Sequence, residues 1–345
     1  MDSPAASPWR PRTGCARPAG RILVLALLTL AVVTAEAGGL RCDACKQPIT
    51  ATYRIFDHKN LHESCYLKYY ALRCAYCNRE ITGPYMAYEG NNLHRECYLK
   101  RFARYCSICE RPIVGEYIHN TWGDAVCAVH VGEFPACEFC GRLRADKLTG
   151  RGTRYRDGRE ICGVCYATAV RRAEDARPLL DSVKSILRRY GIATGLPFEF
   201  HLVDRGQMAS LTPATGRSSW GYTELKRRGG LFRWLQSEKI DMYILDGMPR
   251  VVFMRVAAHE LMHVWLFEHA SLEMDHMLVE GSCEYAAYLA LSEMADPLAR
   301  FDLDNQKSNE DLAYGAGFRS VSGYVSKVGL ENWLGYLRSN LDPPW

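Results

Sequence analysis

Residues 250–269 read RVVFMRVAAHELMHVWLFEH, and this stretch decides the fold of the C-terminal half of the chain. Apolar residues recur along it and leave a narrow polar stripe, which predicts a largely buried helix from about Arg250 to His269. His259 and His263 are one turn apart, so both imidazoles project from the same helix face and can bind one zinc ion. Glu260 lies beside them, where a carboxylate can take a proton from a zinc-activated water molecule and hand it to a leaving amine. The stretch therefore predicts zinc-assisted peptide hydrolysis with Glu260 as the general base.

A zinc site of this kind needs a third protein ligand. In gluzincin-type peptidases a glutamate of the following helix completes the site, and Glu280 stands at a matching distance, sixteen residues after His263. Glu284, one helical turn further on, either takes this place or orients one of the histidines from outside the ligand shell. The metzincin arrangement would use His269, but it needs a glycine where this chain has Leu266. We therefore expect Glu280 to be the third ligand.

Two further parts of a peptidase site have candidates in the sequence. Attack on a carbonyl group builds negative charge on its oxygen, and a hydrogen-bond donor must stabilise that charge. Tyr285, Tyr288 and Tyr314 are candidates for this oxyanion donor, and the sequence does not choose among them. The segment Gly221-Tyr222-Thr223 is a candidate edge strand that would pair with the substrate backbone.

The sequence around the motif predicts a mixed domain of helices and strands over residues 169–345. After Cys165 the cysteines nearly stop, and apolar residues repeat with helical spacing up to Gly191. Phe198–Val203 and Ile240–Leu245 have the composition of strands, and the Gly-rich and Ser-rich stretches at 216–221 and 229–230 are typical of loops. We expect an α+β protein whose C-terminal domain is mainly helical with a small sheet.

The preceding part of the chain, residues 38–168, contains four tandem sets of cysteine and histidine. The second and third sets each begin 32 residues after the one before, and the fourth begins one residue early. Every set consists of two close pairs separated by a loop, which suits a tetrahedral zinc ion. The sets are Cys42, Cys45, His62 and Cys65; Cys74, Cys77, His94 and Cys97; Cys106, Cys109, Cys127 and His130; and Cys137, Cys140, Cys162 and Cys165.

The histidines favour zinc over a disulfide framework, because an imidazole at a fixed place in a repeat has no role in a disulfide. Of the 15 cysteines, only Cys15 and Cys283 remain outside the four sets. Each set supplies four protein ligands and leaves no open position, so these zinc ions are expected to be structural, in addition to one catalytic zinc ion. Aromatic residues in the modules either pack neighbouring modules together or form a peptide-binding face: Tyr66, Tyr69, Tyr70, Tyr98, Phe102 and Tyr105.

The N-terminal segment has the pattern of a secretory signal peptide. Four arginines precede an apolar run from Ile22 to Val33, and Ala35-Glu36-Ala37 follows it. We expect cleavage after Ala37, with an uncleaved N-terminal anchor as the alternative, since the run is shorter than the roughly 20 residues of a membrane-spanning helix. Either outcome predicts that the rest of the chain lies outside the cytoplasm: secreted, periplasmic or at the cell surface. Contact with a membrane is expected only if the segment is uncleaved.

Charge does not point to nucleic acid as a partner. The formal net charge is +4 over 345 residues, and no basic stripe that would follow a phosphate backbone is evident. We therefore expect a protein or peptide substrate, and a protein as the possible partner of the zinc modules.

Four strings of the C-terminal half resemble the plant LIM-domain peptidases of the DA-one-like family: 245–250 (LDGMPR), 258–266 around the motif, 280–283 (EGSC) and 314–319 (YGAGFR). The zinc modules upstream resemble the LIM region of that family. The resemblance implies that His259, His263 and Glu280 bind zinc, that Glu260 is catalytic, and that the activity is endopeptidase cleavage of proteins. The plant members also carry ubiquitin-interacting helices and act inside the cell, whereas this chain shows no such acidic helix and begins with a predicted export signal.

Taken together, the patterns predict a zinc endopeptidase in which LIM-like modules dock a partner or regulate the site. The alternative is a zinc-dependent adaptor in which the modules bind a partner and the peptidase fold is silent. The intact set of two histidines, a glutamate base and a third ligand favours the enzyme.

Overall fold

The computed structural model describes residues 10–11, 24–25, 32–33, 39–113, 116–211, 220–228, 237–271, 273–339 and 342–344. The predicted signal peptide, apart from three two-residue strands within it, lies outside the described residues. The chain divides into two compact units, Trp9–Val131 and Gly132–Trp345. The first three zinc modules belong to the first unit. The fourth lies in the C-terminal unit, whereas the sequence grouped it with the other three and placed the boundary near residue 168.

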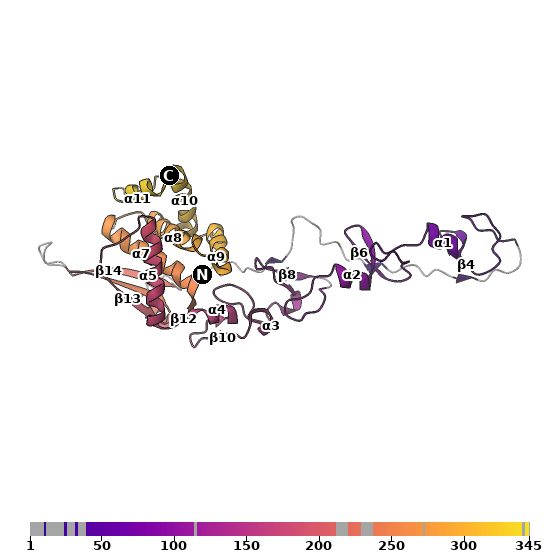
Figure 1. The fold of residues 1–345 in the computed structure, drawn as a ribbon, viewed down its shortest axis with the longest axis horizontal. Coiled ribbons are helices and arrows are strands. Elements are labelled where there is room, and N and C mark those ends of the chain that lie inside the picture. The colour runs from indigo at the N-terminus through magenta and orange to yellow at the C-terminus, as the bar shows by residue number, and fades with distance from the viewer. Residues whose placement is uncertain are drawn as a thin grey trace. The chain divides into compact units, whose positions relative to one another are not determined.

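In the first unit each module is a short hairpin followed by a helical turn (Figure 1). Two-residue strands at the N-terminus pair with these hairpins, giving three sheets in the orders β3-β4-β5, β2-β6-β7 and β1-β8-β9. The elements are β1 (Arg10–Pro11), β2 (Val24–Leu25), β3 (Val32–Val33), β4 (Tyr53–Phe56), β5 (Lys59–His62), α1 (Glu63–Tyr69), β6 (Tyr85–Tyr88), β7 (Asn91–His94), α2 (Arg95–Arg101), β8 (Tyr117–His119), β9 (Ala125–Cys127) and the 3-10 turn η1 (Ala128–His130).

Backbone conformation repeats from module to module as the sequence does. The residue after the second cysteine of each set has a positive φ: Lys46 at 65°, Asn78 at 57°, Glu110 at 60° and Gly141 at 66°. This left-handed residue turns the chain sharply enough for both cysteine sulfurs of a pair to face one point. The modules are small, with cores such as Cys42, Ile49, Leu61 and Tyr66 in the first. Such cores are closed by metal binding as much as by burial.

The C-terminal unit is a mixed α+β fold, as the sequence predicts. Its elements are α3 (Asp146–Thr149), β10 (Thr153–Arg154), β11 (Glu160–Ile161), α4 (Gly163–Ala167), β12 (Ala169–Val170), α5 (Ala173–Arg189), β13 (Phe198–Val203), α6 (Arg205–Leu211), β14 (Gly221–Arg228), β15 (Ser237–Leu245), β16 (Met248–Pro249), α7 (Arg250–His269), α8 (His276–Ser292), α9 (Pro297–Ser308), the π-helix η3 (Leu312–Ala316), α10 (Gly317–Val328) and α11 (Leu330–Leu337).

The main sheet of this unit has three strands in the order β13-β15-β14. β13 runs parallel to β15, with Phe198 opposite Ile240, and β14 runs antiparallel to it, with Gly221 opposite Ile244. β14 is therefore an edge strand of this sheet. The strands expected at 198–203 and 240–245 are present, and the candidate edge segment 221–223 forms the first part of β14.

Helix α7 is buried between this sheet and the helices α5 and α8 (Figure 1). Its apolar residues face nearly every direction, and twelve of its twenty residues are buried, so its side chains pack on all sides. Helix α8 is capped by Asp275, whose side chain accepts hydrogen bonds from the backbone N–H groups of Met277 and Leu278. The two helices that carry the predicted metal ligands therefore lie side by side in the core.

Helices α8 and α10 cross closely at two glycines. A Cβ atom on Gly281 would lie 2.6 Å from the backbone carbonyl carbon and oxygen of Gly317. We expect Gly281→Ala to destabilise the unit by about 1–3 kcal/mol, because overpacking at a backbone contact forces the helices apart. Thermal unfolding would measure the effect as a lower Tm. The matched control is Gly323→Ala on α10, where a Cβ meets nothing within 4 Å and helix propensity should slightly stabilise the fold. Equal Tm values for the two variants would contradict the prediction.

Among the described residues, none of the helices is both long enough and apolar enough to cross a membrane.

Candidate metal centre

Helix α7 presents the two histidines of the motif side by side. The ring centroids of His259 and His263 are 5.0 Å apart. Glu260 is buried on the neighbouring side of the helix, where the Thr223 hydroxyl donates a hydrogen bond of 2.7 Å to its Oε2. Strand β14 passes so close that a Cβ on Gly221 would lie 2.3 Å from Glu260 Oε1. Only glycine fits at this point of the edge strand without displacing the glutamate.

Helix α8 places a carboxylate on each side of His259. Glu280 Oε2 lies 3.2 Å from His259 Nε2, and Glu280 Oε1 lies 3.9 Å from His263 Nε2. On the other side, Glu284 Oε1 lies 3.1 Å from His259 Nδ1. Glu280 thus lies near Nε2 of both imidazoles, and Glu284 holds the opposite ring nitrogen of His259, Nδ1. The four residues are spaced one helical turn apart in each helix, so each pair shares a face.

A buried network holds Glu284 in its ionised form. The Arg255 guanidinium lies 3.2 Å from Glu284 Oε2, and the Gln306 amide donates a hydrogen bond of 2.7 Å to the same oxygen. Burial opposes ionisation, but Arg255 and the hydrogen bonds outweigh it and lower the pKa of Glu284 to about 2. An ionised Glu284 accepts the Nδ1 proton of His259, so that Nε2 is the nitrogen that faces Glu280.

The negative charge of the buried carboxylates favours binding of a cation in this cluster. Glu280 Oε2 makes no hydrogen bond among the described residues, although it lies 3.2 Å from His259 Nε2. Despite burial, Glu280 and Glu284 raise the pKa of His259 to about 10, whereas burial and the charge of His259 lower the pKa of His263 to about 4. Burial also raises the pKa of Glu260 to about 7. Two imidazole nitrogens and an unsatisfied carboxylate oxygen facing one point form a donor set that fits zinc.

A cysteine also faces this point. The sulfur of Cys283 and one ring nitrogen each of His259 and His263 lie within 4.8 Å of one another. The sequence left Cys283 without a role, because it stands outside the four repeated sets. Its position follows from α8, where it is three residues after Glu280 and therefore on nearly the same face.

The candidate oxyanion donors are placed differently. The Tyr314 ring stacks against His259, with centroids 6.0 Å apart, and the carboxylates of the site help burial to raise its pKa. The Tyr285 ring packs against Tyr288 at 5.6 Å, and both rings pack against Phe318. Tyr314 therefore lies at the cluster, on the π-helix η3, while the other two belong to a separate aromatic group.

His269, which the metzincin arrangement would use, does not face the cluster. Its ring stacks on Trp265 with centroids 4.6 Å apart, and its Nδ1 lies 3.0 Å from the Trp265 carbonyl oxygen. His276, for which the sequence predicted no role, lies at the exposed side, with Nε2 3.7 Å from Glu280 Oε1.

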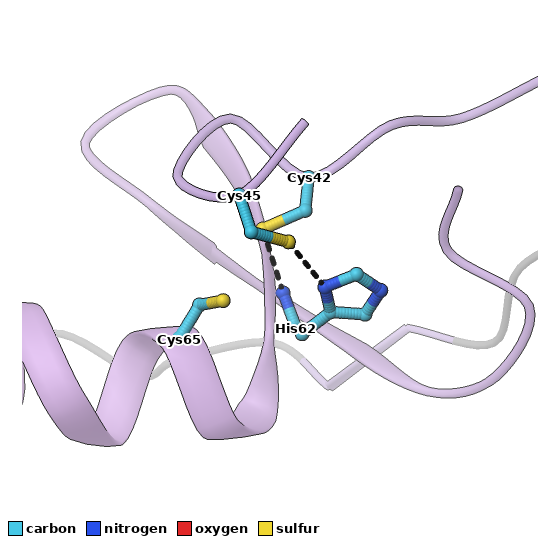
Figure 2. A group of neighbouring side chains, drawn as sticks. All are labelled: Cys42, Cys45, His62 and Cys65. Atoms are coloured by element: carbon cyan, nitrogen blue, oxygen red, sulfur yellow. Dashed lines mark hydrogen bonds between the residues drawn. The ribbon is translucent and has the colours of Figure 1, made fainter. Parts of the chain in front are cut away.

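The cysteine and histidine sets of the zinc modules also come together. In each of the four sets, one ligand atom per residue lies within 4.8 Å of the others. Figure 2 shows the first set, in which Cys45 Sγ lies 3.2 Å from His62 Nδ1 and the backbone N–H of His62 donates to Cys42 Sγ at 3.4 Å. Burial opposes the thiolate form of Cys42, but backbone N–H groups lower its pKa to about 6. No disulfide is present among these cysteines.

The histidine of the first two modules is oriented for metal binding through Nδ1. Nε2 of His62 lies 3.1 Å from the carbonyl oxygen of Pro48, and Nε2 of His94 lies 2.9 Å from that of Glu80. Because a carbonyl can only accept, Nε2 carries the proton and Nδ1 keeps its lone pair toward the sulfurs. The clusters therefore fit zinc binding, as the sequence predicted.

Sequence reasoning missed the residues that support the ligands. Arg255 and Gln306 act on the metal centre only through Glu284, and Thr223 acts only through Glu260. Arg255 does lie one turn before His259 on a predicted helix, which places it on the ligand face. Nothing in the sequence marks Gln306, which comes from a different helix.

Comparison with curated proteins finds relatives in plants. LIM domain-containing protein HDR3 of Oryza sativa subsp. japonica is 23% identical, over 64% of this chain and 56% of that protein. Protein DA1-related 2 and Protein DA1 of Arabidopsis thaliana are each 22% identical over 64% of this chain, covering 53% and 52% of their own lengths. The chain thus spans about half the length of the curated relatives it matches. No protein-family model and no solved structure matches it.

These similarities support the DA-one-like LIM family that the motifs indicated. The name of HDR3 refers to LIM domains, which are protein-interaction modules, and this agrees with the zinc-binding clusters of the first unit.

Proposed function

We propose that this chain is a zinc-dependent endopeptidase that hydrolyses protein or peptide substrates, with a gluzincin-like centre on α7 and α8. The observation that carries the proposal is the placement of three groups: two histidines, a glutamate with an unsatisfied buried oxygen facing them, and a second glutamate under the edge strand. The second glutamate, Glu260, is not one of the proposed ligands, so a purely structural metal site would have no need of it.

In this proposal His259, His263 and Glu280 hold the catalytic zinc, and Glu284 orients His259. The bound ion supplies Lewis acidity to the scissile carbonyl and favours ionisation of water. The two histidines would have to be neutral to act as ligands, so His259 would give up the proton that the carboxylates draw onto it. Glu260 would act in its ionised form, which a cation bound beside it would favour.

Glu260 then moves the proton. Its carboxylate takes a proton from the water that attacks the scissile carbonyl and delivers it to the leaving amine. The Thr223 hydroxyl, 2.7 Å from Glu260 Oε2, fixes the carboxylate in one orientation. The Tyr314 hydroxyl is the favoured oxyanion donor, because its ring stacks on His259 while those of Tyr285 and Tyr288 pack elsewhere.

The edge strand provides a way to hold the substrate. β14 lies at the edge of the described sheet, next to β15, and an extended peptide would add to the sheet there. Gly221 and Thr223 of this strand approach Glu260 directly. A substrate paired along β14 would therefore present its backbone beside the general base.

The four structural zinc ions belong to the modules, which we propose dock a protein partner or regulate the peptidase. We further propose that residues 1–37 direct the chain out of the cytoplasm, so that the substrate is extracytoplasmic. Expression with and without residues 1–37, followed by N-terminal sequencing of the exported chain, tests this. An unprocessed chain retained in the cytoplasm would contradict it.

The proposed activity is tested by hydrolysis of casein, an unstructured protein, by the purified chain lacking residues 1–37. We expect cleavage that a chelator abolishes and zinc restores, with about five zinc ions per chain. A fifth ion without cleavage would favour an inhibited enzyme or an adaptor. Removing residues 38–131 separates these two, because this cut leaves the whole C-terminal unit, including the fourth module, intact. Cleavage by the shortened chain would indicate that the removed modules inhibit the enzyme, and absence of cleavage would indicate an adaptor.

Removing only the hydroxyl of Thr223 tests the positioning of the base. We expect Thr223→Val to lower kcat about tenfold, since one hydrogen bond to a charged group contributes about 1.5–3 kcal/mol and Glu260 keeps its position in part. KM and zinc content should stay near the wild-type values. Thr223→Ser, which keeps the hydroxyl, is the control and should retain most activity. Equal loss in both variants would mean that packing, not the hydrogen bond, is what matters.

A further inference from the structure

The fourth zinc module holds the turn from which the catalytic helix begins. At the tip of the hairpin formed by β10 and β11, Arg159 donates hydrogen bonds to both the carbonyl oxygen and the carboxylate of Asp246, at 2.6 and 2.7 Å. The Tyr155 hydroxyl donates to the Gly247 carbonyl oxygen at 3.1 Å. The Arg159 side chain is only 2% exposed. Asp246 and Gly247 lead directly into β16 and α7, so this hairpin fixes the start of the helix that carries the metal ligands.

The segment after the last zinc ligand holds the same turn by its backbone. The N–H of Gly247 donates to the Val170 carbonyl oxygen at 2.6 Å, and the N–H of Arg250 donates to that of Thr168 at 2.9 Å. Between these two bonds, β12 pairs with β16 in antiparallel register. Gly247 itself has a φ of +70°, and a Cβ there would lie 2.5 Å from the Tyr155 ring. The positive φ of Gly247 and its lack of a Cβ therefore allow the Tyr155 ring of the module to pack closely against this turn.

The other end of the module reaches the edge strand. The Phe139 ring packs edge-on against Trp220, with centroids 5.5 Å apart. Glu138 forms an ion pair with Arg205 of helix α6, which precedes the strand. Trp220 is followed by Gly221, whose backbone lies against the Glu260 carboxylate. The module thus supports the strand beside the general base as well as the helix that carries it.

These contacts come from both zinc-ligand pairs of the module. Glu138 and Phe139 lie between Cys137 and Cys140, while Arg159 and Thr168 lie on either side of the second pair. A zinc ion bound by all four sulfurs fixes the distance between the two groups of contacts. Without that ion the four buried sulfurs lose the ligand that joins the two pairs.

We propose that the fourth zinc module is a positioning element of the catalytic site, so that the site keeps its metal and its activity only while this module is closed on its own zinc. Arg159 is the residue through which the coupling is strongest. This makes the fourth module different in role from the three that precede it. The inference rests on the proposed catalytic centre. It implies that the centre is regulated through the module, because loss of zinc from the four buried cysteines would also inactivate the site.

The test is Arg159→Gln in the full chain, with Arg154→Gln as the matched control in the same hairpin, where the arginine is 69% exposed. Affinity for the ion at His259 and His263 is measured by competition with a chelator. We expect Arg159→Gln to weaken it about tenfold, because a small displacement of the start of α7 moves both histidines away from the geometry that the ion requires. kcat should fall by a similar factor with KM little changed, and Arg159→Lys should restore part of both. Alkylation of the module's cysteines, mapped by mass spectrometry, should show that its own zinc is retained.

Metal affinity and kcat equal to those of Arg154→Gln would overturn the proposal. If the Arg159 variant does not fold, Tyr155→Phe decides the question instead, because it removes only the hydroxyl that holds Gly247. Tyr155→Phe should also lower the metal affinity, by a smaller factor than expected for Arg159→Gln, and an unchanged affinity would overturn the proposal. If the wild-type chain cleaves no substrate, the proposed function fails, but the affinity comparison still tests the coupling.

Discussion

Replacing Glu260 by glutamine is expected to lower kcat by a factor of about 10²–10⁴, the contribution typical of a positioned general base, while zinc content stays unchanged. Glutamine fills the same space under Gly221 and can still accept a hydrogen bond from Thr223, so the packing of β14 on α7 is preserved. The amide cannot take a proton from water. Steady-state hydrolysis of casein or a derived peptide, with zinc measured on the same sample, gives both quantities.

The matched control is Glu268→Gln on the same helix. Glu268 accepts hydrogen bonds from the Thr194 hydroxyl at 2.6 Å and from the Gly195 N–H at 2.9 Å, and neither of these partners belongs to the metal centre. Its loss should lower stability slightly and leave kcat near the wild-type value. If Glu260→Gln retains more than about a tenth of the wild-type kcat, another group is the general base.

Local patterns predicted most of the elements that carry the site. The helix expected at 250–269 has those bounds, because an apolar run of this length with both faces buried has few alternatives. The strands at 198–203 and 240–245 were recognisable from their composition, although the second begins earlier, at Ser237. Metal-ligand sets were also accessible, because zinc geometry demands close pairs and close pairs are visible in a sequence.

Partners from distant parts of the chain were not predictable. Arg159 and Asp246 are 87 residues apart, and their contact depends on how the fourth module packs on the turn before α7. The repeat suggested that this module belongs with the other three, since its ligand spacing is nearly the same. Spacing reports how a module binds zinc and carries no information on what the module's outer surface packs against.

The same limit applies to the roles of the two glutamates on α8. Sequence spacing places Glu280 and Glu284 one turn apart and leaves both open as ligands. What separates them is the side of His259 on which each lies, together with Arg255 and Gln306 behind Glu284. Such a distinction requires the crossing of three helices, which no local pattern encodes.

Replacing Glu280 by glutamine is expected to remove the catalytic metal ion while the modules keep theirs. The carboxylate oxygen that faces His259 Nε2 makes no hydrogen bond among the described residues, so it is placed to bind the ion together with the histidines. We expect affinity for this ion to fall by more than the roughly 10- to 100-fold that loss of an outer partner costs. Zinc should drop from about five ions per chain to about four after dialysis against a weak chelator.

Two companion variants decide what Glu280 does. His276→Ala removes the exposed imidazole 3.7 Å from Glu280 Oε1 and should leave zinc content unchanged, which shows that the effect is not general to this side of the site. Glu284→Gln removes the negative charge beside His259 Nδ1 while leaving an oxygen that can accept its hydrogen bond, and it should weaken binding of the ion by about 10- to 100-fold, less than Glu280→Gln. If Glu284→Gln weakened binding of the ion more than Glu280→Gln did, Glu284 would be the ligand and Glu280 the supporting residue. The unsatisfied oxygen of Glu280 would then have no explanation, so the order of these two affinities is the sharpest test of the ligand set.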